Sequence, residues 1–451
     1  MEKVRELFDY LQDPHLVARF QHLCGVRGIF TTGSCNTPEP TQAHQNGACL
    51  RHGSRGNRSE NAGEAKPAAG AQRTDAEHTR LAQNGAPVPA SATHGESTGT
   101  GTSGQVQDPP RGSTVKPLRK NSLTGDVGQE FVIENRFLFY LFTLGTELGN
   151  ELFYIIFFPF IMWNIDVLVG RRLVMVWVWV MYLGQCTKDL LRWSRPASPP
   201  VVKVEMFYNS EYSMPSTHAM SGTAIPFSLF FMTDGRWEYP SSLGFSLALC
   251  WCLLVCSSRI YMGMHSVLDV IAGFLYTVLL LQFILPALEP VDTFNLTSRF
   301  APLVIVFLHV GLGLLSFTLD TWSTSRGDTA QILGSGAGIA LASQVNQRLG
   351  LIPDLRADQL PLNMPVLSSG LVGGAMLRYA LGLLVLMLTR ALMKAVTVPL
   401  VCWLVGVPGG DTRKARQHME VELPYRYIVY GTIGFNVLFL VPLLFRFLQL
   451  S

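Results

Sequence analysis

The sequence predicts an all-α, polytopic membrane helix bundle that is preceded by a long polar N-terminal region. Of the 451 residues, 48% are hydrophobic and only 15% are charged, whereas soluble domains carry roughly 25% charged residues. The charge deficit is concentrated after residue 130, where apolar runs follow one another with short polar gaps. The net charge of +3 is too small to indicate a nucleic-acid partner. The composition therefore excludes a soluble globular protein and makes the bilayer the main partner.

Residues 1–30 are predicted to form an amphipathic N-terminal segment, because apolar side chains recur there at helical spacing. Pro14 interrupts the pattern, so we expect two short helices that lie on the membrane face or against the domain. Residues 31–130 are rich in Gly, Ser, Thr, Asn, Gln, Ala and Pro and hold few large apolar side chains. Such a segment cannot bury enough surface to offset its chain entropy, so it is predicted to be disordered.

The transmembrane domain is predicted over residues 131–451. Its candidate helices are 137–163, 173–185, 216–232, 241–258, 265–285, 302–319, 329–345, 371–388, 391–405 and 427–448. Since a full span needs ~20 apolar residues, about eight to ten passages are expected. Glu147, Asn150 and Glu151 in the first candidate leave two possibilities open, one long tilted helix or a broken hairpin.

One face of the candidate helix at 329–345 consists of small residues. Gly334, Gly338 and Ala342 recur every four residues, so they share a face that lets another helix approach closely. We interpret this face as structural, because none of its side chains can carry out chemistry.

Ionisable residues cluster in three short motifs, at 188–269, within this apolar domain. The motifs read Lys188-Asp-Leu-Leu-Arg-Trp-Ser-Arg195-Pro196, Pro215-Ser216-Thr217-His218 and Ser258-Arg259-Ile-Tyr-Met-Gly-Met-His265-Ser-Val-Leu-Asp269. Charged side chains are costly in or against a bilayer, so such a cluster indicates a functional site. Cations suit a phosphate group, two histidines suit a nucleophile and a proton donor, and a carboxylate can orient a histidine. The combination predicts a phosphatase.

The first motif places two cations near each other. Lys188 and Arg195 are seven residues apart, close to two helical turns, so both are expected on one face of a helix that Pro196 ends. Arginine can bind phosphate oxygens bidentately, while lysine acts as a point charge. Arg192 could add a contact, but a solvated surface position is favoured for it.

The second motif is typical of the start of a helix. Pro215, Ser216 and Thr217 are residue types that open helices, and an apolar run begins at Ala219. The unpaired N–H groups and the positive dipole end of a helix N-terminus attract anions. His218 in the first turn is therefore placed to protonate a leaving oxygen.

The third motif combines an arginine, a histidine and a carboxylate. His265 and Asp269 are four residues apart, so on a helix they share one face and can touch. A carboxylate on one imidazole nitrogen fixes the tautomer and leaves the other nitrogen free to attack. Arg259 lies six residues before His265, across a short turn. Alone, this motif would indicate a membrane-edge arginine and a buried His–Asp pair; beside the other two it indicates catalysis.

Taken in order, the three motifs resemble the signature of the type 2 phosphatidic acid phosphatase superfamily. This superfamily includes lipid phosphate phosphatases, glucose-6-phosphatase and, more distantly, vanadium haloperoxidases. The Pro-Ser-Thr-His variant, the Tyr-Met-Gly-Met-His run and the helices that follow the third motif look like the sphingosine-1-phosphate phosphatases. The extended N-terminal region further resembles their type 1 form. Thr217 stands where many superfamily members have Gly, and its Cβ limits how closely the backbone can approach phosphate.

The resemblance implies a metal-independent phosphoric monoester hydrolase without a cofactor. Its implied substrates are sphingosine 1-phosphate and related sphingoid base phosphates, cleaved through a phosphohistidine. His265 would be the nucleophile, Asp269 would orient it, and His218 would act as general acid and base. The implied phosphate-binding residues are Lys188, Arg195, Ser216, Thr217 and Arg259. The substrate follows from the resemblance alone, because the motifs do not separate sphingoid phosphates from one another or from phosphatidic acid.

The motifs must all reach one membrane face, and two candidate helices, an even number, separate the second motif from the third. Arg171-Arg172 is the nearest basic pair outside the motifs, so the positive-inside rule places it in the cytosol and the motifs opposite. The resemblance likewise implies a lumenal site in the endoplasmic reticulum. The same rule places the N-terminal region in the cytosol, which requires an even number of passages before Arg171. The glycosylation sequons at Asn57 and Asn295 would then both be cytosolic and unused.

Two other functions are compatible with the motifs. One is a phosphatase of the glucose-6-phosphatase type, which acts on a soluble phosphomonoester. The other is a non-catalytic membrane scaffold or transporter that only binds phosphate, and the two histidines disfavour it because binding needs neither a nucleophile nor an acid. The sequence indicates no protein partner and no oligomeric state.

Overall fold

The computed structural model describes most of the chain outside the polar N-terminal region. The described residues are 2–29, 113–115, 130–205, 211–319, 325–351, 360–363, 365–366, 368–408, 410 and 412–450. One compact unit contains residues 1–31 and 110–451. The disorder predicted for residues 31–130 therefore falls outside the described residues, apart from one short strand.

The N-terminal segment forms two short helices, α1 (Glu2–Gln12) and α2 (Pro14–Leu23). They meet at Asp13, whose side chain accepts a hydrogen bond from the backbone N–H of His15 at 2.8 Å and so caps α2. The break predicted near Pro14 is confirmed, because proline is accommodated in the first turn of a new helix.

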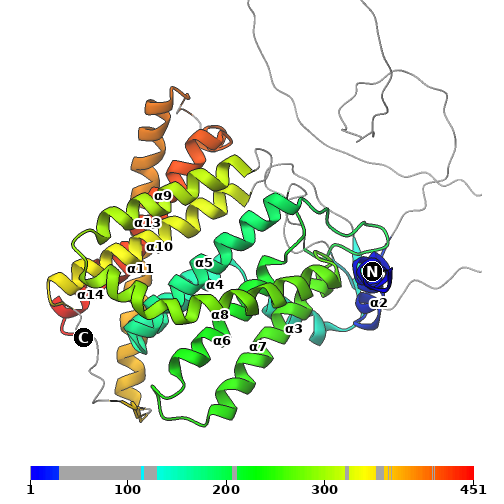
Figure 1. Ribbon diagram of the computed structural model, residues 1–451, viewed down its shortest axis with the longest axis horizontal. Helices are drawn as coiled ribbons and strands as arrows, with labels where there is room; N and C mark the ends of the chain where they lie inside the picture. Colours follow the sequence, from blue (N-terminus) through cyan, green and yellow to red (C-terminus); the bar gives the residue numbers. More distant parts are fainter. Residues whose placement is uncertain are drawn as a thin grey trace, which may run out of the picture. The chain divides into compact units, whose positions relative to one another are not determined.

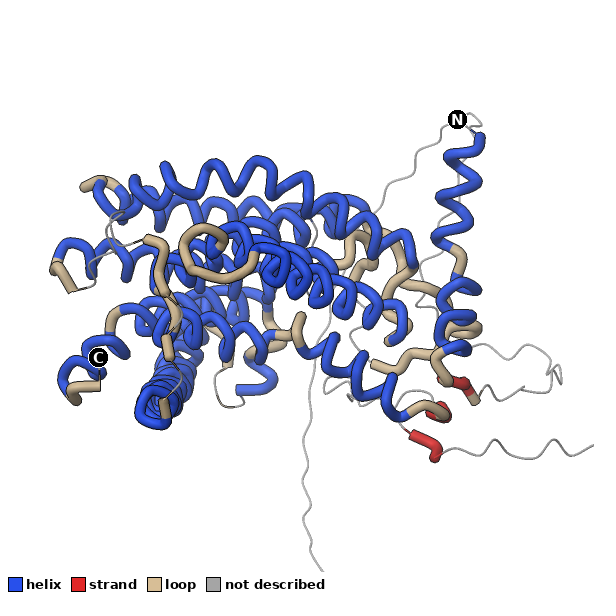
Figure 2. The backbone as a smooth tube through the Cα atoms, turned by 90° about the horizontal axis from the view of Figure 1, so that it is seen from below, coloured by secondary structure: helices blue, strands red, loops and turns tan. Residues whose placement is uncertain are grey.

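A small antiparallel sheet follows the two helices, which an all-α prediction missed. Its strands are β1 (Val26–Gly28), β2 (Ser113–Val115) and β3 (Phe131–Ile133), in the order β1-β3-β2. Figure 2 shows these strands close to the N-terminal helices. A strand of three residues is too short to show an alternating pattern, so the sequence carries no signal for it.

The remaining described residues form a helical membrane domain (Figure 1). Its helices are α3 (Arg136–Glu147), α4 (Glu151–Asn164), α5 (Val167–Leu191), α6 (Thr217–Thr233), α7 (Ser241–Tyr261), α8 (Val267–Thr297), α9 (Ala301–Leu319), α10 (Ser325–Arg348), α11 (Ser369–Val405), α12 (Thr412–Ala415), α13 (Met419–Leu438) and α14 (Leu440–Phe447). Within the described residues, α5, α7, α8, α9, α11 and the α13–α14 pair are the 6 segments long and apolar enough to cross a bilayer. Large apolar side chains on them are exposed, including Leu247, Phe283, Phe307 and Trp403. The chain is a multi-pass membrane protein.

The structure settles one helix boundary that the sequence left open and corrects another. The candidate at 137–163 is broken between α3 and α4, where Asn150 takes an extended conformation. The candidates at 371–388 and 391–405 form the single helix α11. Their polar junction stays helical because the Thr389 hydroxyl donates to the carbonyl of Val385 at 2.9 Å and Arg390 Nη2 donates to the Tyr430 hydroxyl at 3.2 Å.

The small-residue face of α10 packs closely on α13, as predicted. A Cβ on Gly338 would lie 2.0 Å from the carbonyl oxygen of Gly431, and one on Gly334 would lie 2.5 Å from that of Tyr427. The partner face on α13 contains Gly431 and Gly434, which were not part of the prediction. Side chains on either face would force the two helices apart.

The elements before Arg171 run from the end of the bundle that holds the motifs to the end that holds Arg171. Gly145 near the end of α3 lies against Leu254 and Ser258 of α7. Helix α4 then continues in the same direction along the bundle. At the end of α4, Asp166 pairs with Arg236 of the α6–α7 connection, with 2.6 Å between Oδ2 and Nε. The N-terminal helices lie at the motif end, where Gln21 donates to the carbonyls of Val202 and Tyr261, whereas Arg171 pairs with Asp292 near the opposite end of α8.

Candidate active site

A cavity of about 180 Å³ brings the three motifs together. Six of the eight predicted site residues line it: Lys188, Arg195, Thr217, His218, Arg259 and His265. Ser216 and Asp269 do not line the cavity but lie buried behind it. Since the lining residues come from α5, α6, α7 and two connecting segments, only the tertiary fold creates this cationic site.

The first motif contributes its two cations from different elements. Helix α5 ends at Leu191, because Arg192 takes a left-handed conformation with φ 55°. Lys188 therefore stands in the last turn and donates to the Thr217 hydroxyl at 3.1 Å, whereas Arg195 lies in the following loop. The expectation that one helix face carries both is wrong. Arg192 does not line the cavity, in agreement with the surface position favoured for it.

Arg195 is held in place from two sides. Its Nη1 donates to the carbonyl of Met264 at 3.0 Å, which anchors it beside the third motif. Its Nη2 donates to the carboxylate of Glu211 at 3.1 Å. The guanidinium is thus fixed next to His265 before any substrate binds.

The second motif opens α6, as predicted. Ser216 is the N-cap residue, and its Oγ accepts a hydrogen bond from the N–H of Ala219 at 3.4 Å. The Ser216 hydroxyl therefore serves the helix cap, while Thr217 faces the cavity. His218 stands in the first turn, and its Nε2 lies 3.1 Å from Oδ1 of Asn150.

His265 and Asp269 are linked through a third residue. His265 precedes the N-cap of α8, Ser266, so the two side chains do not share a helix face, and His265 Nδ1 is 3.9 Å from Asp269 Oδ2. The Ser213 hydroxyl donates to Asp269 Oδ2 at 2.6 Å and lies 3.4 Å from His265 Nδ1. The backbone N–H of Ser266 also donates to Asp269 Oδ2, at 2.7 Å. His265 and Asp269 thus lie close together, as predicted, but the Ser213 hydroxyl rather than a direct hydrogen bond links them.

The turn that carries His265 depends on a glycine. Gly263 has φ +71°, and a Cβ there would lie 2.2 Å from the carbonyl oxygen of Val202. The segment around Val202 packs on this turn and is itself held by Gln21 of α2, whose amide donates to the Val202 carbonyl at 2.6 Å. The N-terminal segment therefore supports the turn that carries His265.

Two carboxylates face the two arginines of the cavity. Arg259 Nη1 lies 3.1 Å from Glu205 Oε2, as Arg195 does from Glu211. The buried Nε of Arg259 has no hydrogen-bond partner among the described residues. A buried guanidinium N–H of this kind awaits an acceptor, and an incoming phosphate oxygen would supply one.

The electrostatic environment keeps His265 neutral. Burial lowers the pKa of its imidazole well below the usual value, and the positive charges of Arg195, Arg259 and Lys188 lower it further. A neutral imidazole has a lone pair for attack on phosphorus, whereas an imidazolium has none. The three cations that line the cavity thus also keep the His265 imidazole in its neutral form.

Sequence reasoning missed the residues that support this site, namely Ser213, Asn150, Glu205 and Glu211. Asn150 was noted only as a polar position within an apolar segment. The other three lie between the motifs without any spacing that marks them. Among the described residues, no group of three or more His, Cys, Asp or Glu side chains could hold a metal ion.

Known proteins match this chain across the motifs and beyond them. The PAP2 superfamily model matches residues 170–290, which contain all three motifs. The chain is 52% identical to sphingosine-1-phosphate phosphatase 1 of Rattus norvegicus over 441 residues, or 98% of this chain and 97% of that protein. The chain belongs to the sphingosine-1-phosphate phosphatase family. This confirms the predicted superfamily and the predicted class of phosphoric monoester hydrolase.

Other family members support the same assignment. The chain is 51% identical to sphingosine-1-phosphate phosphatase 1 of Mus musculus over 450 residues, covering 100% of this chain and 99% of that protein. It is 39% identical to sphingosine-1-phosphate phosphatase 2 of Homo sapiens over 336 residues, covering 74% of this chain and 84% of that protein. No solved structure matches the chain.

Proposed function

We propose that this protein dephosphorylates sphingosine 1-phosphate and related sphingoid base phosphates within the membrane. The observation that carries the proposal is the cavity in which three cations surround His218 and His265. A smaller, apolar cavity of about 70 Å³ shares lining residues with it and has room for the first carbons of a lipid chain. The substrate named here is the one in the names of the family members.

The proposed reaction has two steps. Lys188, Arg195 and Arg259 bind the phosphoryl oxygens, and Nε2 of His265 attacks phosphorus while Ser213 and Asp269 hold the other ring nitrogen. The bond between phosphorus and the lipid oxygen breaks, and the imidazolium of His218 gives the leaving alkoxide its proton. His218 then takes a proton from water, which attacks phosphorus and releases inorganic phosphate and neutral His265.

Three further features belong to the same proposal. The protein resides in the endoplasmic reticulum membrane, with the active site facing the lumen and the Arg171-Arg172 pair facing the cytosol. Residues 1–30 form a segment that supports the transmembrane domain of residues 131–451, and residues 31–130 form a separate polar region. Because α2 packs against the segments at the motif end, the N-terminal segment then lies on the lumenal face with the active site.

Phosphate release from matched substrates tests the function. We expect the purified full chain in detergent to release phosphate from sphingosine 1-phosphate and not from glucose 6-phosphate. Brief reaction with radiolabelled substrate, followed by denaturation, is expected to leave an alkali-stable and acid-labile label on the protein, as a phosphohistidine would. Hydrolysis of glucose 6-phosphate with equal efficiency would replace the lipid substrate with a soluble one.

A further inference from the structure

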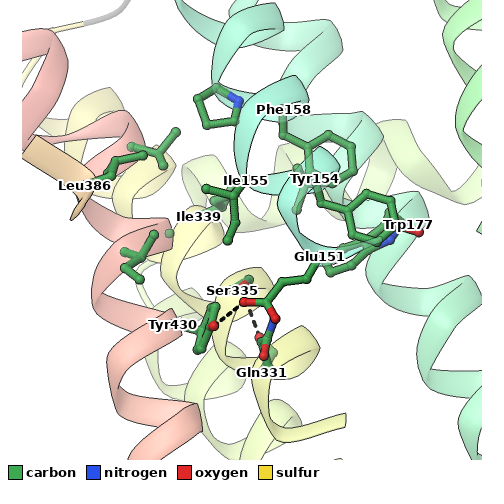
Figure 3. A pocket seen from close by; sticks show the side chains of 15 residues that line it. Glu151, Tyr154, Ile155, Phe158, Trp177, Gln331, Ser335, Ile339, Leu386 and Tyr430 are labelled. Atoms are coloured by element: carbon green, nitrogen blue, oxygen red, sulfur yellow. Dashed lines mark hydrogen bonds between the residues drawn. The ribbon is translucent and has the colours of Figure 1, made fainter. Parts of the chain in front are cut away.

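The cavity that brings the three motifs together is called the head-group cavity from here on. It meets the apolar cavity along a shared edge. The apolar cavity lies between α4, α5, α10, α11 and α13, and Figure 3 shows its lining. Four residues line both cavities: Glu151, Tyr154, Trp177 and Gln331. A lipid whose phosphate occupies the first cavity and whose chain enters the second must pass these four residues.

Glu151 is the charged member of this group. Its carboxylate accepts a hydrogen bond from the Tyr430 hydroxyl, and Arg390 Nη2 lies 3.7 Å from its Oε1. The Glu151 side chain is 45% exposed, and Figure 3 shows it directed toward Tyr430 and Gln331. A carboxylate has about four acceptor sites, so this one can bind a further donor from a ligand.

Asn150 adds an unsatisfied donor next to Glu151. It is 6% exposed and lines the head-group cavity. Its Oδ1 faces His218 Nε2, whereas its buried Nδ2 has no hydrogen-bond partner among the described residues. Buried amide groups are normally satisfied, so this N–H group points to a polar group on the ligand.

We propose that Glu151 recognises the ammonium group of a sphingoid base 1-phosphate and so selects this lipid class. The inference rests on the proposed function. In such a lipid the ammonium is on the carbon next to the one that carries the phosphate, and a hydroxyl is on the following carbon. The ammonium therefore lies between the phosphate and the chain, beside Glu151, and the hydroxyl can accept from Asn150 Nδ2.

Phosphatidic acid differs from a sphingoid base phosphate at this position. It carries ester oxygens there, which cannot donate to a carboxylate. Acceptor oxygens placed against the Glu151 carboxylate repel it and cannot donate the hydrogen bond that an ammonium would add, which disfavours that lipid. Selection would thus come from the repulsion of ester oxygens as well as from the attraction of the ammonium.

The test compares two substrates that differ only at the amine. It measures kcat and KM of the purified full chain for sphinganine 1-phosphate and for an analogue of equal chain length with a hydroxyl in place of the amine. Glu151→Gln is expected to lower kcat/KM for the amine substrate about ten- to hundred-fold, as loss of a charged hydrogen bond does. The analogue should be cleaved as by the wild type, and Glu151→Asp should recover part of the loss.

Asp328→Asn is the matched control. Asp328 lines the head-group cavity but not the apolar one, and it pairs with Arg426 at 2.8 Å. This variant should change kcat/KM by the same factor for both substrates. The proposal is overturned if Glu151→Gln lowers kcat/KM equally for both substrates or for neither of them. It is also overturned if the wild type cleaves both substrates equally well. A wild type that cleaves neither substrate would instead overturn the proposed function.

Discussion

His265 and Asp269 are separated by 3.9 Å between Nδ1 and Oδ2, and the hydroxyl of Ser213 lies between them. The carboxylate therefore acts on the imidazole through a serine. Since the Ser213 hydroxyl donates to Asp269 at 2.6 Å, its oxygen remains available to accept from His265 Nδ1. This arrangement leaves Nε2 of His265 as the attacking atom.

The first prediction concerns Ser213 as a positioning residue. Ser213→Ala should lower kcat about 5- to 100-fold with little change in KM, because loss of a buried hydrogen bond costs ~1–3 kcal/mol. Single-turnover formation of the phosphoenzyme measures the effect, and Ser213→Thr, which keeps a hydroxyl, should recover part of it. Ser228→Ala is the control, since Ser228 is also buried but its hydroxyl has no partner among the described residues. Equal loss in both variants would assign Ser213 a structural role only.

The second prediction concerns the two histidines. His265→Ala should reduce phosphate release to background and remove the covalent label, because the proposed phosphohistidine forms on this side chain. His218→Ala should slow both formation and breakdown of the labelled intermediate. His309→Ala is the control, because His309 is buried in α9 with its Nδ1 near the carbonyl of Ile305 and does not line the cavity. Robust turnover by His265→Ala would remove this residue from the mechanism.

The third prediction concerns the phosphate-binding cations. Arg259→Ala should lower kcat/KM by about 30- to 1,000-fold, because removing one electrostatic stabiliser costs ~2–4 kcal/mol. Arg259→Lys should recover part of the activity. The control is Arg192→Ala, which changes an arginine outside the cavity. Thermal unfolding of each variant is needed as well, since Arg259→Ala leaves Glu205 without its 3.1 Å partner. Normal turnover by a folded Arg259→Ala would mean that the motifs do not converge on phosphate.

The fourth prediction concerns pH. The pKa of His265 is lowered well below its usual value, first by burial and then by Arg195 and Arg259. Its imidazole therefore stays neutral as the pH falls through the usual range, and reactivity is lost only below the lowered pKa. Phosphoenzyme formation in single turnovers should keep its rate down to about pH 6.5, the ordinary pKa of histidine. A decline that begins above that pH would contradict a neutral, buried nucleophile.

The fifth prediction concerns membrane topology. Epitope tags at the two ends should lie on opposite faces, because α2 contacts the catalytic turn whereas α14 lies at the other end of the unit (Figure 1). In cells whose plasma membrane alone is permeabilised, an antibody should detect the C-terminal tag and not the N-terminal one. Detection of both would contradict the single passage formed by α3 and α4. Detection of the N-terminal tag alone would place the active site in the cytosol.

The same topology also predicts which side of the membrane a glycosylation sequon faces. With a lumenal active site, the sequon at Asn295, near the opposite end of α8, lies on the cytosolic side and stays unmodified. A glycan on Asn295, lost in Asn295→Gln, would reverse this orientation.

The sequence by itself determined the helical membrane class, the three motifs and the residue types of a phosphatase. Hydrophobic runs and motif spacing are local properties, so they are visible before folding. The start of α6 at Ser216 and the close packing of Gly338 were predictable for the same reason.

Only the tertiary structure decided how these parts meet. Arg195 reaches the site from a loop, Ser213 stands between His265 and Asp269, and Glu151 lies where two cavities join. Each of these relations joins segments that are far apart in the chain or depends on where a helix ends. Periodicity within one segment carries no information about them, because side-chain contacts between elements arise only when the elements pack.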